Sequence, residues 1–345
     1  MMPRRKFIKQ TSLATLGMAS LNAFPGSLSH SEDAIIGHGS HRYKIDVNWG
    51  LLNSKRFPVK DCHEMVQDAK GRILLLTNHT KNNVLIYDKS GKLLQSWGTE
   101  YPGAHGLTLH NENGTEFLYI CDNERHEVIK TTLEGKVIQV FPFPQETGKY
   151  DKKEQYVPTE TTIAANGDVY VADGYGSQYI THYDAKGNIK GIFGGKGNEE
   201  HLFNNAHGIC IDDRNPKNPT LLITARQQNK LKRFTLDGEY LNSIDLPGAY
   251  ICRPVIHNKH VYLATIWSGD GSEGTGFVSI LDENNKLISA PGGSAPVYEN
   301  NSLNPMYQTL KVFRHPHDVC VDDDENLYIA QWNSWGTYPI KLYRV

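Results

Sequence analysis

The sequence predicts an all-β fold, a six-bladed β-propeller in which an N-terminal strand closes the last blade. Three observations predict it. A unit of short alternating strands and Gly- or Asn-containing turns recurs along the chain. The unit returns at a spacing of about 40–60 residues, and each copy holds about four strands, which is typical of propeller blades. The third observation is the number of copies, which sets the number of blades.

The first copy reads HEMVQDAKGRILLLTNHTKNNVLIYDKSGKLLQSWG and shows the pattern clearly. The six copies occupy residues 63–98, 105–141, 159–194, 207–244, about 253–290 and 317–345. The fifth copy is the weakest, with HVYLATIW as its second strand. The sixth stops after its third strand, which would leave a bare sheet edge.

The segment YKIDVNWG, at 43–50, ends like the LLQSWG of the first copy. It is therefore predicted to supply the missing outer strand and to close the ring. One propeller domain then extends from residue 40 to residue 345.

Residues 1–32 are predicted to be an export signal and a flexible leader rather than part of the fold. Arg4 and Arg5 lie in PRRKFIKQ, before the mildly apolar stretch TSLATLGMASLNAF. This order is typical of a twin-arginine signal. We therefore expect a periplasmic or extracellular protein that is exported already folded. No later stretch reaches about 18 apolar residues, so no membrane span is expected.

The charge balance argues against a nucleic-acid partner, because 36 basic residues stand against 38 acidic ones and the net charge is −2. We expect a monomer. The five cysteines are odd in number and form no CxxC pair, so buried small residues are favoured over an assignable disulfide.

Histidines recur at the start of the predicted innermost strands, in GAHGLTL (103–109), NNAHGIC (204–210) and HPHDVCV (315–321). Alignment of the copies gives one channel-lining column. Its members are His63, His105, Thr159, His207, a residue near Val255, and His317.

Copies two, four and six would be alternate blades, about 120° apart, so His105, His207 and His317 should converge from three directions. Three imidazoles with an open fourth position form a metal site of the catalytic type. Neutral nitrogens favour zinc, while iron, cobalt and copper remain open. His63, on an adjacent blade, and His315, two residues before His317, are predicted to support these ligands or to line the channel.

Two further side chains are candidates for chemistry. Tyr175 in ADGYGSQY follows the second strand of copy three, and Arg226 in ITARQQNKLKRF takes the matching place in copy four. Taken singly, Tyr175 suits an aromatic side chain packed at the rim. Arg226 suits a cation that lies at the surface or pairs with an Asp. Beside a metal, a phenol and a guanidinium can act as general base and carboxylate anchor.

These motifs resemble the peptidyl-α-hydroxyglycine α-amidating lyases, within the wider NHL-repeat propellers. The likeness extends over most of 61–345. The matching segments are AHGL (104–107), VPT (157–159), GDVYVADGYGSQ (167–178), NNAHGI (204–209), TARQQNKLKRF (224–234) and PHDV (316–319).

The resemblance implies a catalytic zinc on His105, His207 and His317. It implies that Tyr175 is catalytic, with a pKa lowered by nearby cations, and that Arg226 holds the substrate. It also implies a structural calcium, held partly by Asp318 and by the backbone carbonyl of Leu107. The implied reaction splits an N-acyl α-hydroxyglycine, a small or peptide-derived carboxylated substrate, into an amide and glyoxylate.

Departures from the family pattern leave the substrate open to another hemiaminal. Gly176 stands where animal members have a disulfide-forming Cys, and His315 stands where a Met is expected. The expected first-blade Arg is not evident, and His79 and Lys81 are present instead.

Two other functions compete with a zinc lyase. A non-catalytic NHL propeller would present its rim insertions, 145–156 and 291–308, to a protein or glycan. A lactonase-like hydrolase would use calcium bound by carboxylates and Asn. The histidine column favours the lyase, because a scaffold does not need it and calcium prefers oxygen ligands.

Overall fold

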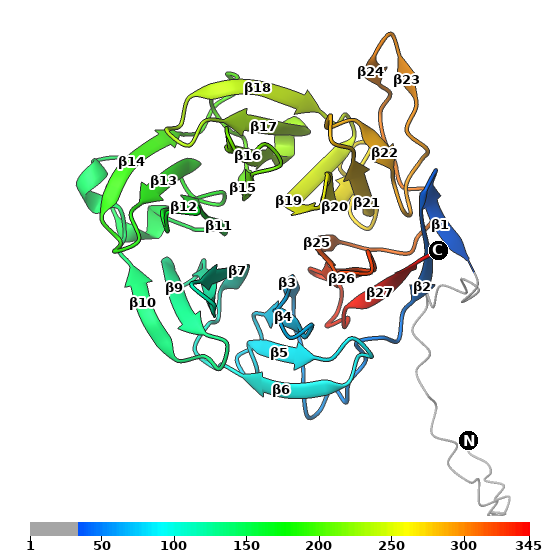
Figure 1. Cartoon of the computed structure of the whole chain (residues 1–345), viewed down its shortest axis with the longest axis horizontal. Helices are drawn as coiled ribbons and strands as arrows, with labels where there is room; N and C mark the ends of the chain where they lie inside the picture. Colours follow the sequence, from blue (N-terminus) through cyan, green and yellow to red (C-terminus); the bar gives the residue numbers. More distant parts are fainter. Residues whose placement is uncertain (1–33) are drawn as a thin grey trace, which may run out of the picture.

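The computed structural model describes residues 34–345, and the predicted export signal lies outside these residues. The described chain forms six radial sheets around a central axis, as the prediction required (Figure 1). Within 34–345 there is no α-helix, and none of its helical segments is long and apolar enough to cross a bilayer.

Each of the first three blades has four antiparallel strands, which are numbered from the channel outward. Blade one contains β3 (Cys62–Gln67), β4 (Ile73–Thr77), β5 (Val84–Tyr87) and β6 (Leu93–Trp97). Blade two contains β7 (Ala104–Glu112), β8 (Thr115–Asp122), β9 (Glu127–Thr132) and β10 (Val137–Phe141). Blade three contains β11 (Glu160–Ile163), β12 (Val169–Ala172), β13 (Tyr179–Tyr183) and β14 (Ile189–Gly194), after the 3-10 turns η1 (Gln145–Thr147) and η2 (Lys153–Gln155).

Blades four and five repeat this arrangement, and blade six has five strands. Blade four contains β15 (Ala206–Asp212), β16 (Thr220–Ala225), η3 (Arg226–Gln228), β17 (Lys230–Phe234) and β18 (Tyr240–Asp245). Blade five contains β19 (Ala249–His257), β20 (His260–Ser268), β21 (Phe277–Leu281) and β22 (Leu287–Ser289), followed by the hairpin β23 (Tyr298–Glu299) and β24 (Ser302–Leu303). Blade six contains β25 (Pro316–Val321), β26 (Leu327–Gln331), β27 (Ile340–Arg344), β2 (His41–Asp46) and β1 (Ile35–His38).

An N-terminal strand closes the ring, which confirms the prediction. β2 pairs with β27, Lys44 lying opposite Tyr343, and β1 adds a further edge strand. The closing strand ends at Asp46 rather than at residue 50, because Trp49 packs into the core instead of extending the strand. Its ring is buried in the core between blades six and one, and its Nε1–H donates to the carbonyl of Lys89 at 3.0 Å.

The blades are held together by apolar side chains packed between neighbouring sheets. The buried residues of 34–345 form six clusters, one for each pair of adjacent blades. In one of them Leu75 and Leu85 of blade one meet Tyr328 and Ala330 of blade six. Each pair of faces is removed from water only when both blades are present, so the blades stabilise one another around the circle.

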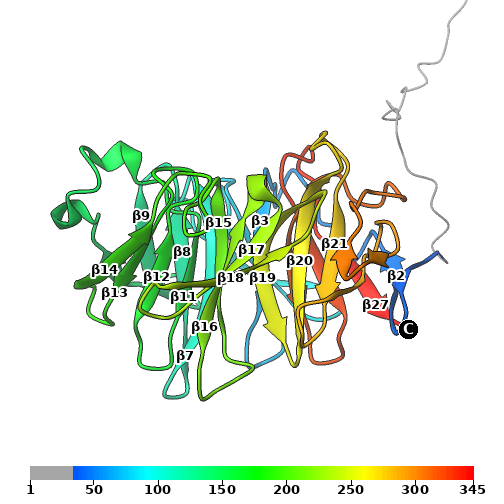
Figure 2. The same cartoon turned by 90° about the horizontal axis from the view of Figure 1, so that it is seen from above.

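The innermost strands run along the axis (Figure 2), and five of them carry a β-bulge near their start. In β25, for example, the register shifts between Pro316 and Asp318. A bulge interrupts strict alternation, so two consecutive side chains can both point into the channel. The bulges thereby create two stacked layers of channel residues.

Candidate active site

Four imidazoles meet at one level of the channel and are called the histidine ring: His63, His105, His207 and His317. Each is the second residue of its innermost strand. All four are at most 4% exposed. The three predicted ligands lie together, with ring centroids 4.9 Å apart for His105 and His207 and 4.8 Å apart for His317 and either of these.

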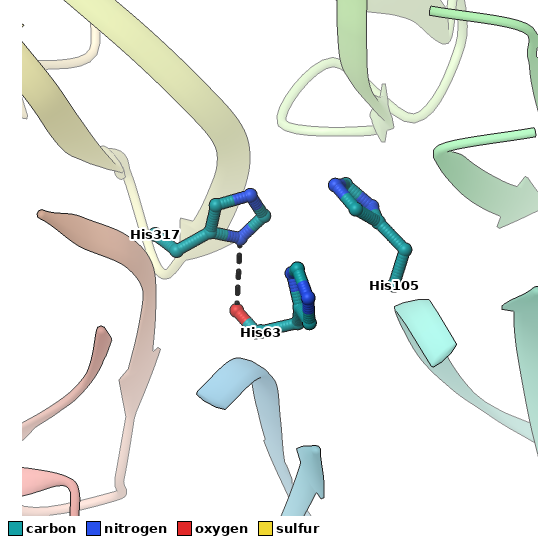
Figure 3. Close-up of side chains that lie close together, drawn as sticks. All are labelled: His63, His105 and His317. Atoms are coloured by element: carbon teal, nitrogen blue, oxygen red, sulfur yellow. Dashed lines mark hydrogen bonds between the residues drawn. The ribbon is translucent and has the colours of Figure 1, made fainter. Parts of the chain in front are cut away.

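His63 is a full member of the histidine ring rather than a supporting residue. Its centroid lies 4.6 Å from that of His105 and 4.9 Å from that of His317 (Figure 3). Its backbone carbonyl also accepts a hydrogen bond from His317 Nδ1 at 3.0 Å.

Backbone carbonyls fix the tautomers of two ring members. His105 Nδ1 lies 2.8 Å from the carbonyl of Thr159, and His317 Nδ1 lies 3.0 Å from that of His63. A carbonyl only accepts, so each Nδ1 donates and each Nε2 keeps a lone pair. His317 Nε2 and the Nδ1 atoms of His63 and His207 are buried without a hydrogen-bond partner. Oriented imidazoles with unpartnered nitrogens are what a metal site requires.

The histidine ring is neutral at physiological pH. Burial lowers the pKa of His63 to about 3. Burial also holds the pKa values of His105, His207 and His317 well below the usual range, and the neighbouring Arg226 guanidinium adds to this. Only a neutral imidazole has the lone pair that a metal ion needs.

The donor atoms fall into two sets that share His317. His63, His105 and His317 each offer an atom within 4.8 Å of the others, and so do His207, Cys252 and His317. Cys252, not a residue near Val255, fills the column in blade five, so that alignment was wrong. The register shift between Ile251 and Pro254 displaces the repeat there, and the fifth copy lacks the histidine that marks copies one, two, four and six.

The Tyr175 hydroxyl lies at the mouth of the histidine ring. It is 3.1 Å from Nε2 of both His105 and His207, while the residue as a whole is 42% exposed. Burial of the phenol raises its pKa, and the Arg226 guanidinium opposes this without overcoming it. The prediction that nearby cations lower the Tyr175 pKa is therefore wrong when only the protein's own groups act on the phenol.

The turn that carries Tyr175 is organised by the Asp173 carboxylate. It accepts from the Val157 N–H at 2.7 Å, the Ser177 N–H at 2.6 Å and the Tyr150 hydroxyl at 3.0 Å. A Cβ on Gly176 would lie 2.1 Å from Asp173 Oδ1, so no side chain fits there. The carboxylate thus fixes this turn, and the 145–156 insertion helps it through Tyr150.

Arg226 begins η3 and is 3% exposed, with Nη2 3.0 Å from Cys252 Sγ. With Tyr175 it lines a cavity of about 420 Å³ whose walls also include Lys196, Trp267 and Trp332. Cations and indoles side by side suit a ligand with a carboxylate and an apolar part. The last three residues were not predicted, since the repeat pattern marks the core positions of these segments and not the residues that reach the cavity.

His315 braces loops rather than the histidine ring. Its Nε2 accepts from the Gly274 N–H at 3.0 Å, and its Nδ1 lies 3.2 Å from the carbonyl of Asn333. Both nitrogens are therefore used on backbone groups at the rim.

The predicted calcium ligands do not fit a calcium ion, because a guanidinium already holds them. Arg253 Nε and Nη2 lie 3.0 and 2.9 Å from the two carboxylate oxygens of Asp318, and Nη1 lies 2.7 Å from the carbonyl of Leu107. The prediction of a calcium ion at Asp318 and Leu107 is therefore wrong.

A larger cavity, about 930 Å³, is lined by channel residues further along the same strands, including Thr108, Thr161 and Ile209. Arg253 forms part of its lining, whereas the ring histidines do not. The candidate active site is therefore reached from the side of Tyr175 and Arg226.

Comparison with known proteins supports the fold and the predicted resemblance. No family model matches the chain. A curated relative, a probable peptidyl-alpha-hydroxyglycine alpha-amidating lyase of Caenorhabditis elegans, is 30% identical over 107 residues, which is 31% of this chain. The match covers 30% of that relative's length. Over this part of the chain, the similarity is to a probable lyase of the family that the motifs resemble.

Solved structures share the propeller fold. A streptogramin B lyase superposes with a TM-score of 0.56 at 15% identity, over 85% of this chain and 95% of its own. A virginiamycin B lyase from Staphylococcus aureus gives 0.52 at 14% identity, over 91% and 97%. A gluconolactonase from Xanthomonas campestris gives 0.56 at 10% identity, over 91% and 99%. At these identities the likeness shows the architecture alone.

Proposed function

We propose that this protein is an exported, zinc-dependent carbon–nitrogen lyase that splits an N-acyl α-hydroxyglycine or a related carboxylated hemiaminal into an amide and glyoxylate. One observation carries the proposal: buried imidazoles, three of them with an unpartnered nitrogen, converge beside a tyrosine hydroxyl and an arginine. The partial likeness to an amidating lyase supports the same chemistry.

His105, His207 and His317 would hold the metal. His317 belongs to both sets of donor atoms, His105 shares one set with His63, and His207 shares the other with Cys252. A zinc ion bound there supplies Lewis acidity, which lowers the pKa of a hydroxyl on the substrate.

Tyr175 would take the proton of that hydroxyl as a phenolate, a form that a cation bound beside it would favour because burial alone raises the pKa of the phenol. As the proton leaves, the C–O bond becomes the aldehyde of glyoxylate and the C–N bond breaks. The bonding pair goes to nitrogen, which takes up a proton and leaves as the amide. The Tyr175 phenol can return the proton it received, so the atoms balance within one turnover.

Arg226 would bind the substrate carboxylate, with Lys196 as a second cation on the same cavity wall. A guanidinium pairs with a carboxylate in a planar, directional way. Trp267 and Trp332 would contact the acyl group, which favours an apolar or aromatic one.

The proposal is tested with the full-length protein as purified, by elemental analysis and by glyoxylate release from N-benzoyl α-hydroxyglycine. We expect about one transition-metal ion per chain and equal amounts of benzamide and glyoxylate. His207→Ala should lose both the metal and the turnover. His201→Ala, whose side chain is 57% exposed, is the matched control and should keep both.

Metal-free wild-type protein without turnover would overturn the lyase and favour the rim-binding propeller. Zinc with no glyoxylate release would reject this substrate class.

Export is proposed from Arg4 and Arg5 alone. Replacing both by Lys should leave the protein in the cytoplasm, as cell fractionation would measure. An unchanged location would reject the twin-arginine route.

A further inference from the structure

Directly beneath the histidine ring lies a second layer, one residue further along each innermost strand. It is called the ion layer and consists of Glu64, Glu160, Arg253 and Asp318, with Gly106 and Gly208 filling the two remaining blades. The three carboxyl-bearing residues are fully buried and Arg253 is 8% exposed.

The Arg253 guanidinium is the centre of this layer. It forms a two-point pair with Asp318, at 3.0 and 2.9 Å. Its Nη1 lies 3.3 Å from a carboxylate oxygen of Glu64, and its Nε lies 3.8 Å from one of Glu160. Nη1 and Nη2 donate to the carbonyls of Leu107 and Met65 at 2.7 and 3.1 Å. Carboxylates and carbonyls around one positive charge are the donor types that bind a hard divalent cation.

The two glycines allow the strands to approach this centre. A Cβ on Gly208 would lie 2.5 Å from the Cα of Arg253, and a Cβ on Gly106 would lie 2.6 Å from the carbonyl of Thr159. The backbone of β19 can therefore lie close enough for its arginine to reach the axis.

Several contacts of the Arg253 guanidinium lie close to a ring histidine in sequence. Met65 and Leu107 follow His63 and His105 by two residues, and Asp318 follows His317. The guanidinium therefore touches the strands of these three histidines, and the Arg253 backbone lies against Gly208 on the strand of His207.

We propose that Arg253 is a built-in cation, a positioning residue that holds the strands of His63, His105 and His317 in place of a bound calcium ion and makes the fold independent of calcium. This goes beyond the proposed lyase and does not depend on it. The function of a divalent ion is thereby carried by a side chain that cannot dissociate.

The first test is thermal unfolding of the full-length wild-type protein in EGTA and in millimolar CaCl2. The melting temperature should differ between the two by less than about 1 °C, because no calcium stabilises the native state. Stoichiometric calcium in the purified protein, or a clear loss of stability in EGTA, would overturn the proposal.

The second test removes the internal cation. Arg253→Ala leaves Glu64, Glu160 and Asp318 facing one another, so the melting temperature in EGTA should fall by about 5–10 °C. Millimolar CaCl2 should restore at least half of that loss, because the emptied place is lined by oxygen donors. Arg253→Lys, which keeps the charge, should lose less and gain nothing from calcium. Equal calcium responses of Arg253→Ala and wild type would contradict the proposal.

The positioning role has its own readout, the visible spectrum of Co²⁺ bound to the histidine ring. Arg253→Lys should weaken Co²⁺ binding about tenfold and shift the bands, as changes around metal ligands do. Lys232→Met is the matched control, because Lys232 is fully buried in blade four and donates to the carbonyl of Leu202 at 2.5 Å. It should lower the melting temperature without altering the Co²⁺ spectrum. If Arg253→Ala does not fold, Arg253→Lys and the wild-type measurements still decide the question.

Discussion

The histidine ring and the ion layer are built from adjacent residues of the same strands, yet they differ in how their polar groups are held. The upper layer leaves imidazole nitrogens without partners and opens toward Tyr175 and Arg226. The lower layer gathers its carboxyl groups around the Arg253 guanidinium, although Glu64 Oε1 and Glu160 Oε2 are also buried without a hydrogen-bond partner. A layer of neutral donor atoms that opens to a cavity suits a ligand, whereas a layer built around its own cation suits a structural role.

The comparison also shows how β-bulges give one channel two layers of side chains with different roles. Because each bulge turns two consecutive side chains inward, His317 and Asp318 can serve different layers. Changes in the upper layer should therefore affect turnover, and changes in the lower layer should affect stability.

The largest expected effect is that of Tyr175→Phe. Loss of the hydroxyl should lower turnover of an N-acyl α-hydroxyglycine by about 10²–10⁴-fold, the range for loss of a general acid–base group. Metal content and unfolding free energy should stay the same. Steady-state kinetics and elemental analysis measure this, with Tyr307→Phe, on an exposed part of the rim, as control. Unaltered rates would remove Tyr175 from the mechanism.

In the lower layer, Asp318→Asn should reduce the unfolding free energy by about 3–5 kcal/mol, because the buried guanidinium loses its two-point partner. Urea unfolding measures it, with the exposed Asp323→Asn as control. A loss below about 1 kcal/mol, typical of an exposed pair, would mean that the ion layer is not a structural centre.

Gly208→Ala should cost about 1–3 kcal/mol of unfolding free energy, since the new Cβ would overlap the Arg253 backbone. Gly191→Ala is the control, because no atom lies within 4 Å of the Cβ position there. Equal stability of the two variants would show that β15 and β19 can separate freely.

The smallest effect is expected for His315→Phe. Removal of two hydrogen bonds to rim loops should cost about 0.5–1.5 kcal/mol of unfolding free energy, chiefly from the unpaired Gly274 N–H. Metal content should not change. Loss of the metal would place His315 among the residues that support the histidine ring.

Repeats and turn residues in the sequence were enough to predict the architecture and the closing strand. The histidine motifs likewise predicted which imidazoles share the channel mouth, because His105, His207 and His317 occupy equivalent places in repeated units. Periodicity that survives in a sequence translates directly into a shared level around the axis.

The sequence did not reveal Cys252 and Arg253, because the fifth copy lacks the motif and its bulge shifts the register. The sequence also predicted Asp318 and Leu107 as calcium ligands without predicting Arg253, whose guanidinium holds them. The Arg253 guanidinium of blade five contacts Asp318 of the neighbouring blade six and the Leu107 carbonyl of blade two across the channel, and no local sequence pattern records such contacts. Trp267 and Trp332 were missed for the same reason, since they reach the cavity from strands whose repeats mark only the core.

The pairing of β2 with β27 has a consequence for biosynthesis. While β27 is still within the ribosome, β2 can pair only with β1 and the sixth blade cannot join the first. The circle therefore completes only after β27 has left the ribosome, and until then one blade face of the nascent chain stays uncovered. Any machinery that receives this chain at that stage meets an open arc of blades rather than a finished disc.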